Sequence, residues 1–427
     1  MKQEKQIKPI NILHIDSYDK YGGAQKSTVN SLKAIKSALK SSQPNSKYNF
    51  NFYVIHNNNK IYEEELNNLN IPNFSIKMKN FGDIAAIIKI SRFLKKYKIN
   101  IVIFHSSRDH MLGGIACFLS GKKIIKILTR HVAYNISFLK GFLIYHLLTD
   151  HYIAISKYIK NILIDDLKIN PDKITVIYDI RFADDIYDIT DTADTTGVNA
   201  GKYADKDMDR DKIDTVGIGT DKYRDKADEI KNHVKKELNI PEEMKIVSII
   251  GRLSNEKGHI TFLNAAKFII KKRKDIKFMI IGDGDLFADI KEFITNNKLS
   301  DYIIMLGFKK NVEQYIEASD LIIVPSGLEG LGGIIVESCM RKKAVIASNV
   351  GGIPEIINDG LTGILFEKDD FHELADKILN VIDDEKMLSE LGNNCCKKIT
   401  EEFNPYKLAE ENINLYLRLL KLESLNI

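Results

Sequence analysis

The residues best placed for chemistry lie in one stretch, 321–354, where acids and glycines follow an apolar run. The run from Leu321 to Val324 is typical of a buried parallel strand, which Pro325 and Ser326 end. A glycine-rich turn follows, and then an apolar helical pattern from Ile334 to Met340. A strand, a glycine turn and a helix in this order place free backbone N–H groups in front of an anion.

Two carboxylates occupy this stretch. Glu329 lies in the turn before the helix, and Glu337 lies about one turn inside it. A second strand, Ala344 to Ser348, leads into another glycine turn at Gly351 and Gly352. Ordinary packing of a strand on a helix also uses glycines, and Glu337 would then face solvent. The combination of turn glycines, two acids and a second glycine turn favours a binding site.

A second candidate for anion binding precedes it in the chain. The apolar run from Ile246 to Ile250 ends in Gly251, and Arg252 and Lys257 follow within a few residues. A fixed Arg and Lys can neutralise an anion. The alternative is a surface loop with two solvated cations, but the strand before the loop and the spacing favour the functional interpretation.

The first half of the chain offers histidines and a glycine turn. His105 and His131 each follow a predicted strand, at the carboxyl end where α/β sheets place ligands. A lone histidine is more often structural, so His105 is the weaker candidate. Gly22 and Gly23 form a turn between the first strand and a helical pattern, which is by itself a weak signal.

Strands that alternate with helical patterns predict the α/β class, and 427 residues predict two domains. The strands expected in the first half are Ile10–Ile15, Asn51–Ile55, Ile101–Phe104, Ile124–Leu128, Tyr152–Ile155 and Ile174–Tyr178. Those expected in the second half are Ile246–Ile250, Lys277–Ile281, Ile303–Leu306, Leu321–Val324 and Ala344–Ser348. Gly282 and Gly284 follow one of them, but Phe287 stands where a dinucleotide fingerprint needs its third glycine.

Charge is unevenly distributed along the chain. Residues 1–182 carry 28 Lys and Arg against 13 Asp and Glu, whereas 183–230 carry 7 against 14 and 231–427 carry 27 against 31. The basic first segment indicates an anionic partner such as a membrane surface, although a solvated basic face is an equal alternative; nucleic acid is not expected. The acidic segment 183–230 has few large apolar residues and predicts a linker. Its alternating aspartates do not make a calcium loop, because Arg210 and Val216 stand where glycine and glutamate are required.

The cysteines and the apolar runs indicate the cellular compartment in which the protein is expected. Cys117, Cys339, Cys395 and Cys396 show no disulfide framework and no zinc spacing, so we expect them to be reduced and expect no metal site. No apolar run approaches the ~18–20 residues that span a bilayer, and the N-terminus lacks the core of a signal peptide. We expect a cytoplasmic protein, either free or peripheral at the inner face of the cytoplasmic membrane.

The motifs together resemble the signature of the retaining GT-B glycosyltransferases of family 4. That signature has proline-serine, then Glu-Gly-Phe-Gly, then a second Glu, and here it reads Pro325, Ser326, Glu329-Gly330-Leu331-Gly332 and Glu337. The segment from Gly251 to Gly258 resembles the family's Gly-Arg-Leu…Lys-Gly. The chain departs from the pattern at Leu331, where an aromatic is usual, at Gly333, where Leu is usual, and at Asp179-Ile180, where Asn-Gly is usual.

The resemblance implies a GT-B fold, in which two Rossmann-like βαβ domains face across a cleft and the C-terminal helix crosses back to the first domain. The implied segments are an acceptor-side domain 1–182, an insertion 183–230, a nucleotide-sugar-binding domain 231–404 and a terminal helix 405–427.

The resemblance also implies a role for each matching residue. The implied catalytic residues are Glu329 on sugar hydroxyls, Arg252 and Lys257 on the diphosphate, and His131 on the donor-sugar side. The residues implied to bind the nucleotide are Glu337 on the ribose, Phe308 beside the base, and Gly22, Gly23, Gly251, Gly282, Gly332, Gly333 and Ile334 around the phosphates.

The implied reaction is the retaining, metal-independent transfer of a hexosyl group from a nucleotide-sugar, UDP-sugar in first place and GDP-sugar in second. No other cofactor is implied. The implied acceptor is a glycan or a lipid-linked molecule, in the synthesis of cell-envelope polysaccharide or glycolipid. The alternatives are a nucleotide-sugar-binding protein of the same fold with weak or no catalysis, an inverting or epimerising GT-B enzyme, and a phosphorylase. For the phosphorylase, the sequence shows no pyridoxal lysine site.

Overall fold

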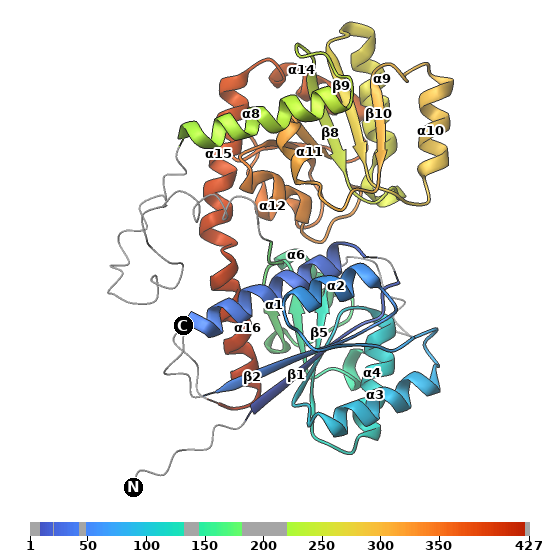
Figure 1. Cartoon of the computed structure of the whole chain (residues 1–427), viewed down its shortest axis with the longest axis vertical. Coiled ribbons are helices and arrows are strands. Elements are labelled where there is room, and N and C mark those ends of the chain that lie inside the picture. Colours follow the sequence, from blue (N-terminus) through green and yellow to red (C-terminus); the bar gives the residue numbers. More distant parts are fainter. Residues whose placement is uncertain (1–8, 20, 42–47, 132–144, 182–219, 423–427) are drawn as a thin grey trace. The chain divides into compact units, whose positions relative to one another are not determined.

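The protein is described by a computed structural model that covers residues 9–19, 21–41, 48–131, 145–181 and 220–422 (Figure 1). The chain divides into two compact units. Unit 1 comprises Met1–Arg181 together with Phe403–Ile427, and unit 2 comprises Phe182–Glu402. The last helix of the chain therefore belongs to the same unit as the first strand.

Unit 1 is built on a seven-stranded parallel sheet with the order β3-β2-β1-β4-β5-β6-β7. Its strands are β1 (Pro9–Asp16), β2 (Asn49–His56), β3 (Asn73–Ser75), β4 (Ile101–Phe104), β5 (Ile125–Arg130), β6 (His151–Ala154) and β7 (Ile174–Val176). Every residue of β4 and β6 is buried, as expected for parallel strands covered on both faces.

The helices of unit 1 are α1 (Gly23–Ser41), α2 (Lys60–Asn68), α3 (Ile84–Lys96), α4 (Ser107–Leu119), α6 (Lys157–Asp165) and α16 (Pro405–Leu419). Polar residues begin several of them: Asp83 accepts from Ala86 N at the start of α3, and Ser106 and Asp109 form a capping box on α4. The C-terminal α16 packs against α1 within this unit. Helix α1 starts at Gly23, directly after Gly22.

Unit 2 holds a six-stranded parallel sheet with the order β10-β9-β8-β11-β12-β13. Its strands are β8 (Lys245–Ile250), β9 (Ile276–Ile281), β10 (Ile303–Gly307), β11 (Leu321–Val324), β12 (Ala344–Ser348) and β13 (Ile364–Phe366). Its helices are α8 (Thr220–Glu237), α9 (His259–Lys272), α10 (Phe287–Asn296), α11 (Glu313–Ala318), α12 (Gly333–Met340), α13 (Ile353–Ile356), α14 (Phe371–Val381) and α15 (Glu385–Glu402). Phe262, Phe278 and Ile323 are fully buried in its main core. The predicted α/β class is thus confirmed in both units.

Three local expectations need correction or a limit. The acidic segment 183–230 was expected to be a linker, but helix α8 begins at Thr220, so part of that segment is helical. The apolar spacing of residues 84–97 predicts an amphipathic helix, and α3 forms there, but Ile84 and Ile88 of that pattern are 70% and 42% exposed. The aspartates that were considered for calcium, 205–211, lie outside the described residues.

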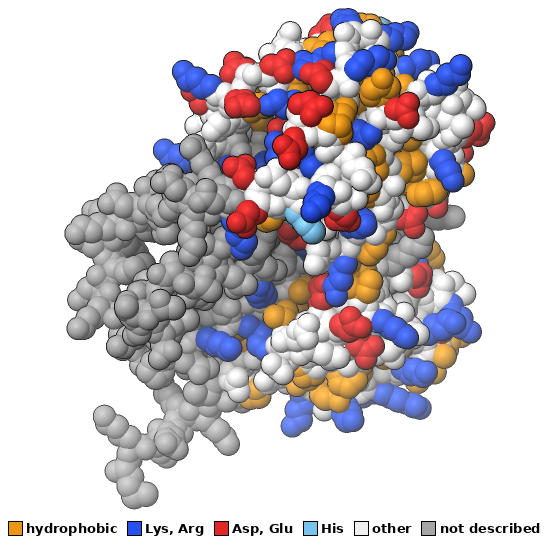
Figure 2. All heavy atoms as spheres, turned by 45° about the horizontal axis from the view of Figure 1, so that its top comes forward, with side chains coloured by type: hydrophobic (Ala, Val, Ile, Leu, Met, Phe, Trp, Pro, Cys, Tyr) orange, Lys and Arg blue, Asp and Glu red, His pale blue; other side chains and the backbone are white. Residues whose placement is uncertain are grey.

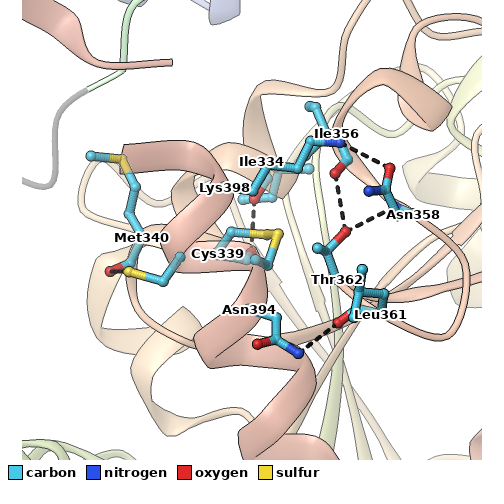
Figure 3. The surroundings of a disulfide bond; sticks show 12 residues. Ile334, Cys339, Met340, Ile356, Asn358, Leu361, Thr362, Asn394 and Lys398 are labelled. Atoms are coloured by element: carbon cyan, nitrogen blue, oxygen red, sulfur yellow. Dashed lines mark hydrogen bonds between the residues drawn. A yellow bond between two sulfur atoms is a disulfide. The ribbon is translucent and has the colours of Figure 1, made fainter. Parts of the chain in front are cut away.

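The expectation of reduced cysteines is wrong for one pair. Cys339 in α12 and Cys395 in α15 form a disulfide with their Cα atoms 5.2 Å apart (Figure 3). Their sequence separation of 56 gave no sign of it, because only the packing of α12 on α15 brings the two residues together. Cys117 and Cys396 remain free, and burial raises the pKa of the Cys117 thiol to about 12.

Charge differs between the units. Figure 2 shows acidic and basic side chains interspersed over the visible face of unit 2, whereas mainly basic ones follow the margin of unit 1. In the described part of the chain, no helix combines the length and the apolar character that crossing a membrane requires.

Candidate functional site

Glycines line the carboxyl ends of three neighbouring strands in unit 2. Gly251 follows β8, Gly282 follows β9 and Gly307 ends β10. A Cβ atom on Gly282, whose φ is +146°, would lie 1.8 Å from the Gly251 carbonyl oxygen. The backbone is tied across these ends, since Gly282 N donates to Gly307 O at 2.9 Å. The backbone is therefore closely packed at Gly282, whereas a Cβ atom on Gly251 or Gly307 would meet nothing within 4 Å.

The loops after β8 and β11 are in direct contact. Gly258 adopts a left-handed conformation with a φ of +70°, and a Cβ atom there would lie 1.8 Å from the Pro325 carbonyl oxygen. Gly327 N also donates to Glu256 O at 2.8 Å. Because β8 and β11 are adjacent in the sheet, this contact places Lys257 beside the turn that carries Glu329.

Lys257 and Glu329 form the central ion pair of unit 2. Lys257 Nζ lies 2.5 Å from Glu329 Oε2, and Ser326 Oγ donates to the same oxygen at 3.2 Å. The side chains are 28% and 14% exposed, so the pair is partly buried but reachable from solvent. A cation in this position can stay with the carboxylate or turn toward an anionic ligand.

The N-terminus of α12 lies in the same turn. Its N-cap, Gly332, has a φ of +99°, and no described side chain caps this end of the helix. The first N–H groups, those of Gly333 and Ile334, begin a helix whose macrodipole favours an anion. The second glycine turn braces this loop, because Gly352 N donates to Glu329 O at 3.1 Å.

Glu337 and two further predicted residues have different surroundings. Glu337 is only 5% exposed on the second turn of α12, so it does not simply face solvent. Arg252 is 63% exposed and pairs with Glu256 at 2.5 Å, and its implied role on the diphosphate stays a prediction. Phe308 is 54% exposed just after β10.

In unit 1, Gly22 and Gly23 are exposed at the start of α1, and a buried polar scaffold holds them. Gly22 N donates to Gln25 Oε1 at 3.0 Å, and Gln25 Nε2 in turn donates to Asp16 Oδ1 at 3.0 Å. Burial, and then the charge of Asp109, raise the pKa of the Asp16 carboxyl to about 7. The glycine turn is therefore held, through Gln25, by the Asp16 carboxyl, whose pKa is raised.

His131 is hydrogen-bonded to a second histidine, and this one to a third. His131 Nε2 lies 3.2 Å from His105 Nδ1, and His105 Nε2 lies 3.0 Å from His14 Nδ1. Together with Ser27 and Asp179 they line a cavity of about 40 Å³ between the sheet, α1 and α16. Burial lowers the pKa of His14 to about 3 and lowers those of the other two histidines.

The sequence reasoning overlooked two features of these sites. His14 lies inside an apolar strand pattern, and only the sheet order could have shown it next to His105. Lys368 brings another cation to the β11 loop, because a Cβ atom on Gly327 would lie 3.2 Å from its Cε.

At the atypical Asp179-Ile180 step, Asp179 accepts from Ser27 Oγ and pairs with Arg181 at 2.6 Å. The hydrogen bond to Ser27 anchors the step to α1.

Two family profiles match the chain. The profile described as "Glycosyl transferases group 1" matches residues 230–398, and the one described as "Glycosyltransferase Family 4" matches residues 48–179. An Escherichia coli protein, UDP-Gal:alpha-D-GlcNAc-diphosphoundecaprenol alpha-1,3-galactosyltransferase, is 27% identical over 81% of this chain and 82% of its own length. The capsular polysaccharide biosynthesis glycosyltransferase CapM from Staphylococcus aureus is 24% identical over 80% of this chain and 82% of its own length.

A solved structure shares the fold across nearly the whole chain. Anabaena HepE in complex with UDP and glucose superposes with a TM-score of 0.73 at 18% identity, covering 97% of this chain and 100% of that one. Two units, each built on a parallel sheet covered by helices, define the GT-B fold class. The chain belongs to the family 4 glycosyltransferases, as the profiles of both halves show.

Proposed function

We propose that the protein transfers a hexosyl group from a UDP-sugar to a glycan or lipid-linked acceptor with retention of anomeric configuration. The observation that carries the proposal is the Lys257–Glu329 pair, set 2.5 Å apart beside the uncapped N-terminus of α12. A nucleoside diphosphate gains negative charge as it leaves, so a fixed cation and free N–H groups stabilise the transition state more than the ground state.

Each residue of unit 2 takes a role in this proposal. Lys257, with Arg252 turning away from Glu256, neutralises the leaving diphosphate, and Glu329 then binds sugar hydroxyls. Glu337 binds the ribose, and Phe308 lies beside the base. These cations and the helix N-terminus supply the charge that a metal ion supplies in other transferases, so we expect activity to persist with a chelator present.

The donor and acceptor classes are supported by what related proteins bind. HepE was crystallised with UDP and glucose, and the Escherichia coli relative is named for UDP-Gal and an undecaprenol-linked acceptor. A lipid-linked acceptor or a growing capsular chain would place the reaction in cell-envelope synthesis. GDP-sugar is the second donor candidate.

Thermal shift against UDP, GDP, ADP and CDP tests the donor site. We expect one nucleotide, UDP, to stabilise the wild type and to stabilise Lys257→Ala much less. Lys272→Ala is the matched control, since this exposed lysine of the same unit lies 3.9 Å from Asp376 and over the Phe268 ring, with no partner in the Lys257–Glu329 pair. If no nucleotide shifts the melting temperature, the donor site is not where we place it. Binding without turnover of any UDP-sugar would favour the alternative of a binding protein.

Retention of configuration is tested on the product, and metal independence is tested by activity with a chelator. Proton NMR of the first product formed from a UDP-α-hexose should show an α-linkage, and a β-linkage would contradict retention. Activity that is lost with EDTA and restored by manganese would contradict metal independence.

We also propose that unit 1 has a surface that binds the membrane, where a lipid-linked acceptor would be found. On α3, Ile84 and Ile88 are exposed next to Lys89 and Arg92, and Phe118 at the end of the adjacent α4 is 83% exposed. Apolar side chains among cations are what binding to an anionic bilayer surface requires, and each cation adds about 1 kcal/mol near such a surface. The alternative is a basic face that is simply solvated.

Vesicle sedimentation separates these alternatives. We expect co-sedimentation with vesicles that contain phosphatidylglycerol and not with pure phosphatidylcholine, and we expect it to weaken in Ile84→Ser/Phe118→Ser. A variant with a matched change on unit 2, Phe287→Ser, should behave as wild type, since this exposed side chain lies on α10. If the protein does not co-sediment with anionic vesicles at low salt, the proposal that unit 1 binds the membrane is wrong.

A further inference from the structure

Three histidines lie on the same face of the unit 1 sheet: His14 is in β1, His105 directly follows β4 and His131 directly follows β5. In the register of β1 and β4, His14 pairs with Ile103, two residues before His105. In the register of β4 and β5, Ile103 pairs with Ile127, four residues before His131. Because side chains alternate along a strand, all three imidazoles lie on the face that α1 and α16 cover.

The imidazoles form a continuous hydrogen-bonded chain. The ring centroids of His14 and His105 are 5.3 Å apart and those of His105 and His131 are 5.5 Å apart, and nitrogens of successive rings lie 3.0 and 3.2 Å from each other. A neutral imidazole has one N–H donor and one acceptor nitrogen. His105 must therefore donate to one neighbour and accept from the other, so the three tautomers are locked together.

Only two arrangements satisfy both hydrogen bonds. In the first, each histidine carries its proton on Nδ1, and His131 Nδ1–H is the free end of the chain. In the second, each proton is on Nε2, and His131 Nδ1 is a bare acceptor. No described residue bonds to His131 Nδ1.

The opposite end of the chain favours the first arrangement. His14 Nε2 is buried and has no hydrogen-bond partner in the described residues. The second arrangement would leave an N–H group there, and orphaned buried N–H groups are the rarer case in proteins. The first leaves a bare nitrogen instead.

The surroundings keep the chain uncharged. Burial is the largest influence on each ring, and it lowers the pKa of all three histidines. The charges that act on His131 come from Asp179, which favours its protonated form, and from Arg181 and Arg130, which oppose it. The two outer rings, His14 and His131, also oppose the charging of His105 between them.

We propose that His14 and His105 are positioning residues that hold His131 as the neutral Nδ1–H tautomer, so that His131 donates a hydrogen bond to an oxygen of the bound sugar substrate. This role rests on the proposed glycosyl transfer. A donor whose orientation and tautomer are set in advance needs no reorganisation when charge develops in the reaction.

The tautomer can be read directly by NMR of the full-length protein with ¹⁵N-labelled histidine, with His131→Gln used to assign the signals. At neutral pH we expect His131 to show a protonated Nδ1 and a bare Nε2. In His105→Leu, the His131 signals should move to the averaged positions of a free imidazole. His105→Asn should restore the wild-type pattern, because the Asn amide nitrogen takes the place of Nδ1 and can donate to His131 Nε2. His372, on α14 of unit 2, is the internal control.

Two results would overturn the proposal. One is a wild-type His131 that carries its proton on Nε2, and the other is a His131 tautomer that is unchanged in His105→Leu. The wild-type spectrum depends on no variant of His105, so a failure of His105→Leu to fold leaves the first test intact.

Turnover tests the role in catalysis separately. With a UDP-sugar that the wild type uses, kcat should fall about tenfold in His105→Leu and recover in His105→Asn, while the KM of the donor stays unchanged. An unchanged kcat in His105→Leu would refute the positioning role. Absence of wild-type turnover with every UDP-sugar would instead reject the proposed function, and the NMR result would still decide the tautomer.

Discussion

Gly258 offers a direct test of the contact that assembles the donor site. Its φ is +70°, and an alanine Cβ atom would lie 1.8 Å from the Pro325 carbonyl oxygen. To reach ordinary contact at 3.4 Å, the β8 and β11 loops would have to separate by about 1.6 Å. A shift of that size next to Lys257 would pull its ammonium group away from Glu329, and misplacements of about 1 Å can cost roughly 100-fold in rate.

Two costs add up in Gly258→Ala. The left-handed backbone costs about 1–2 kcal/mol for any residue with a Cβ atom, and forcing packed groups apart costs about 1–3 kcal/mol more. Gly360 isolates the first cost, because its φ is +72° and a Cβ atom there would meet nothing within 4 Å. We therefore expect Gly360→Ala to lose about 1–2 kcal/mol of unfolding free energy and Gly258→Ala about 2–5 kcal/mol.

Urea unfolding of both variants measures these free energies, and nucleotide-induced thermal shift measures the donor site. Gly360→Ala should keep the wild-type response to the nucleotide, whereas Gly258→Ala should lose most of it. Equal stability losses in the two variants, with equal nucleotide responses, would show that the two loops do not touch as described and would refute the reasoning.

Three further predictions follow from the ion pair, the disulfide and the buried acids. Lys257→Met should lower kcat/KM about 100- to 1,000-fold but the unfolding free energy by only about 1 kcal/mol, because the pair is partly exposed; a loss of stability that matches the loss of activity would contradict this. Reduction of Cys339–Cys395 should destabilise unit 2 by about 4 kcal/mol on the chain-entropy account, measured by urea unfolding with and without reductant, with Cys395→Ser insensitive to reductant. The pKa of Asp16 is raised to about 7, so the folded state holds a proton that the unfolded state releases near pH 4; stability from this group is present below pH 4 and is lost as pH rises through 7. Asp16→Asn should change the slope of stability with pH in that window by up to about 1.4 kcal/mol per unit, and an unchanged slope would refute the shift.

Much of the fold could be predicted from the sequence, because apolar runs bounded by glycine and polar residues are typical of parallel strands. The predicted run Leu321–Val324 is β11, and Ala344–Ser348 is β12. Glu329 and Lys257 could each be selected from local patterns, but their contact could not. It spans 72 residues and depends on β8 lying next to β11, an order that local patterns do not specify.

Other parts of the sites depend on packing that leaves no local signal. His14 sits within an apolar strand and reads as one more core position, and the sheet order places it beside His105. The pairing of Cys339 with Cys395 depends on how α12 meets α15. Arg252 was selected for its spacing, yet its guanidinium group lies against Glu256.

The place of α16 in unit 1 has a consequence for the order of synthesis. Helix α1 leaves the ribosome before unit 2 does, but its partner α16 is made only after all of unit 2. Leu408, Ile413 and Leu417 are buried in unit 1, so its core stays incomplete until α16 is translated. Domains generally fold as units and N-terminal ones first during synthesis, but here unit 2 can finish before unit 1. A chain that ends before Phe403 would therefore contain all of the second unit but an incomplete first unit, and the incomplete unit would be exposed to proteases and chaperones.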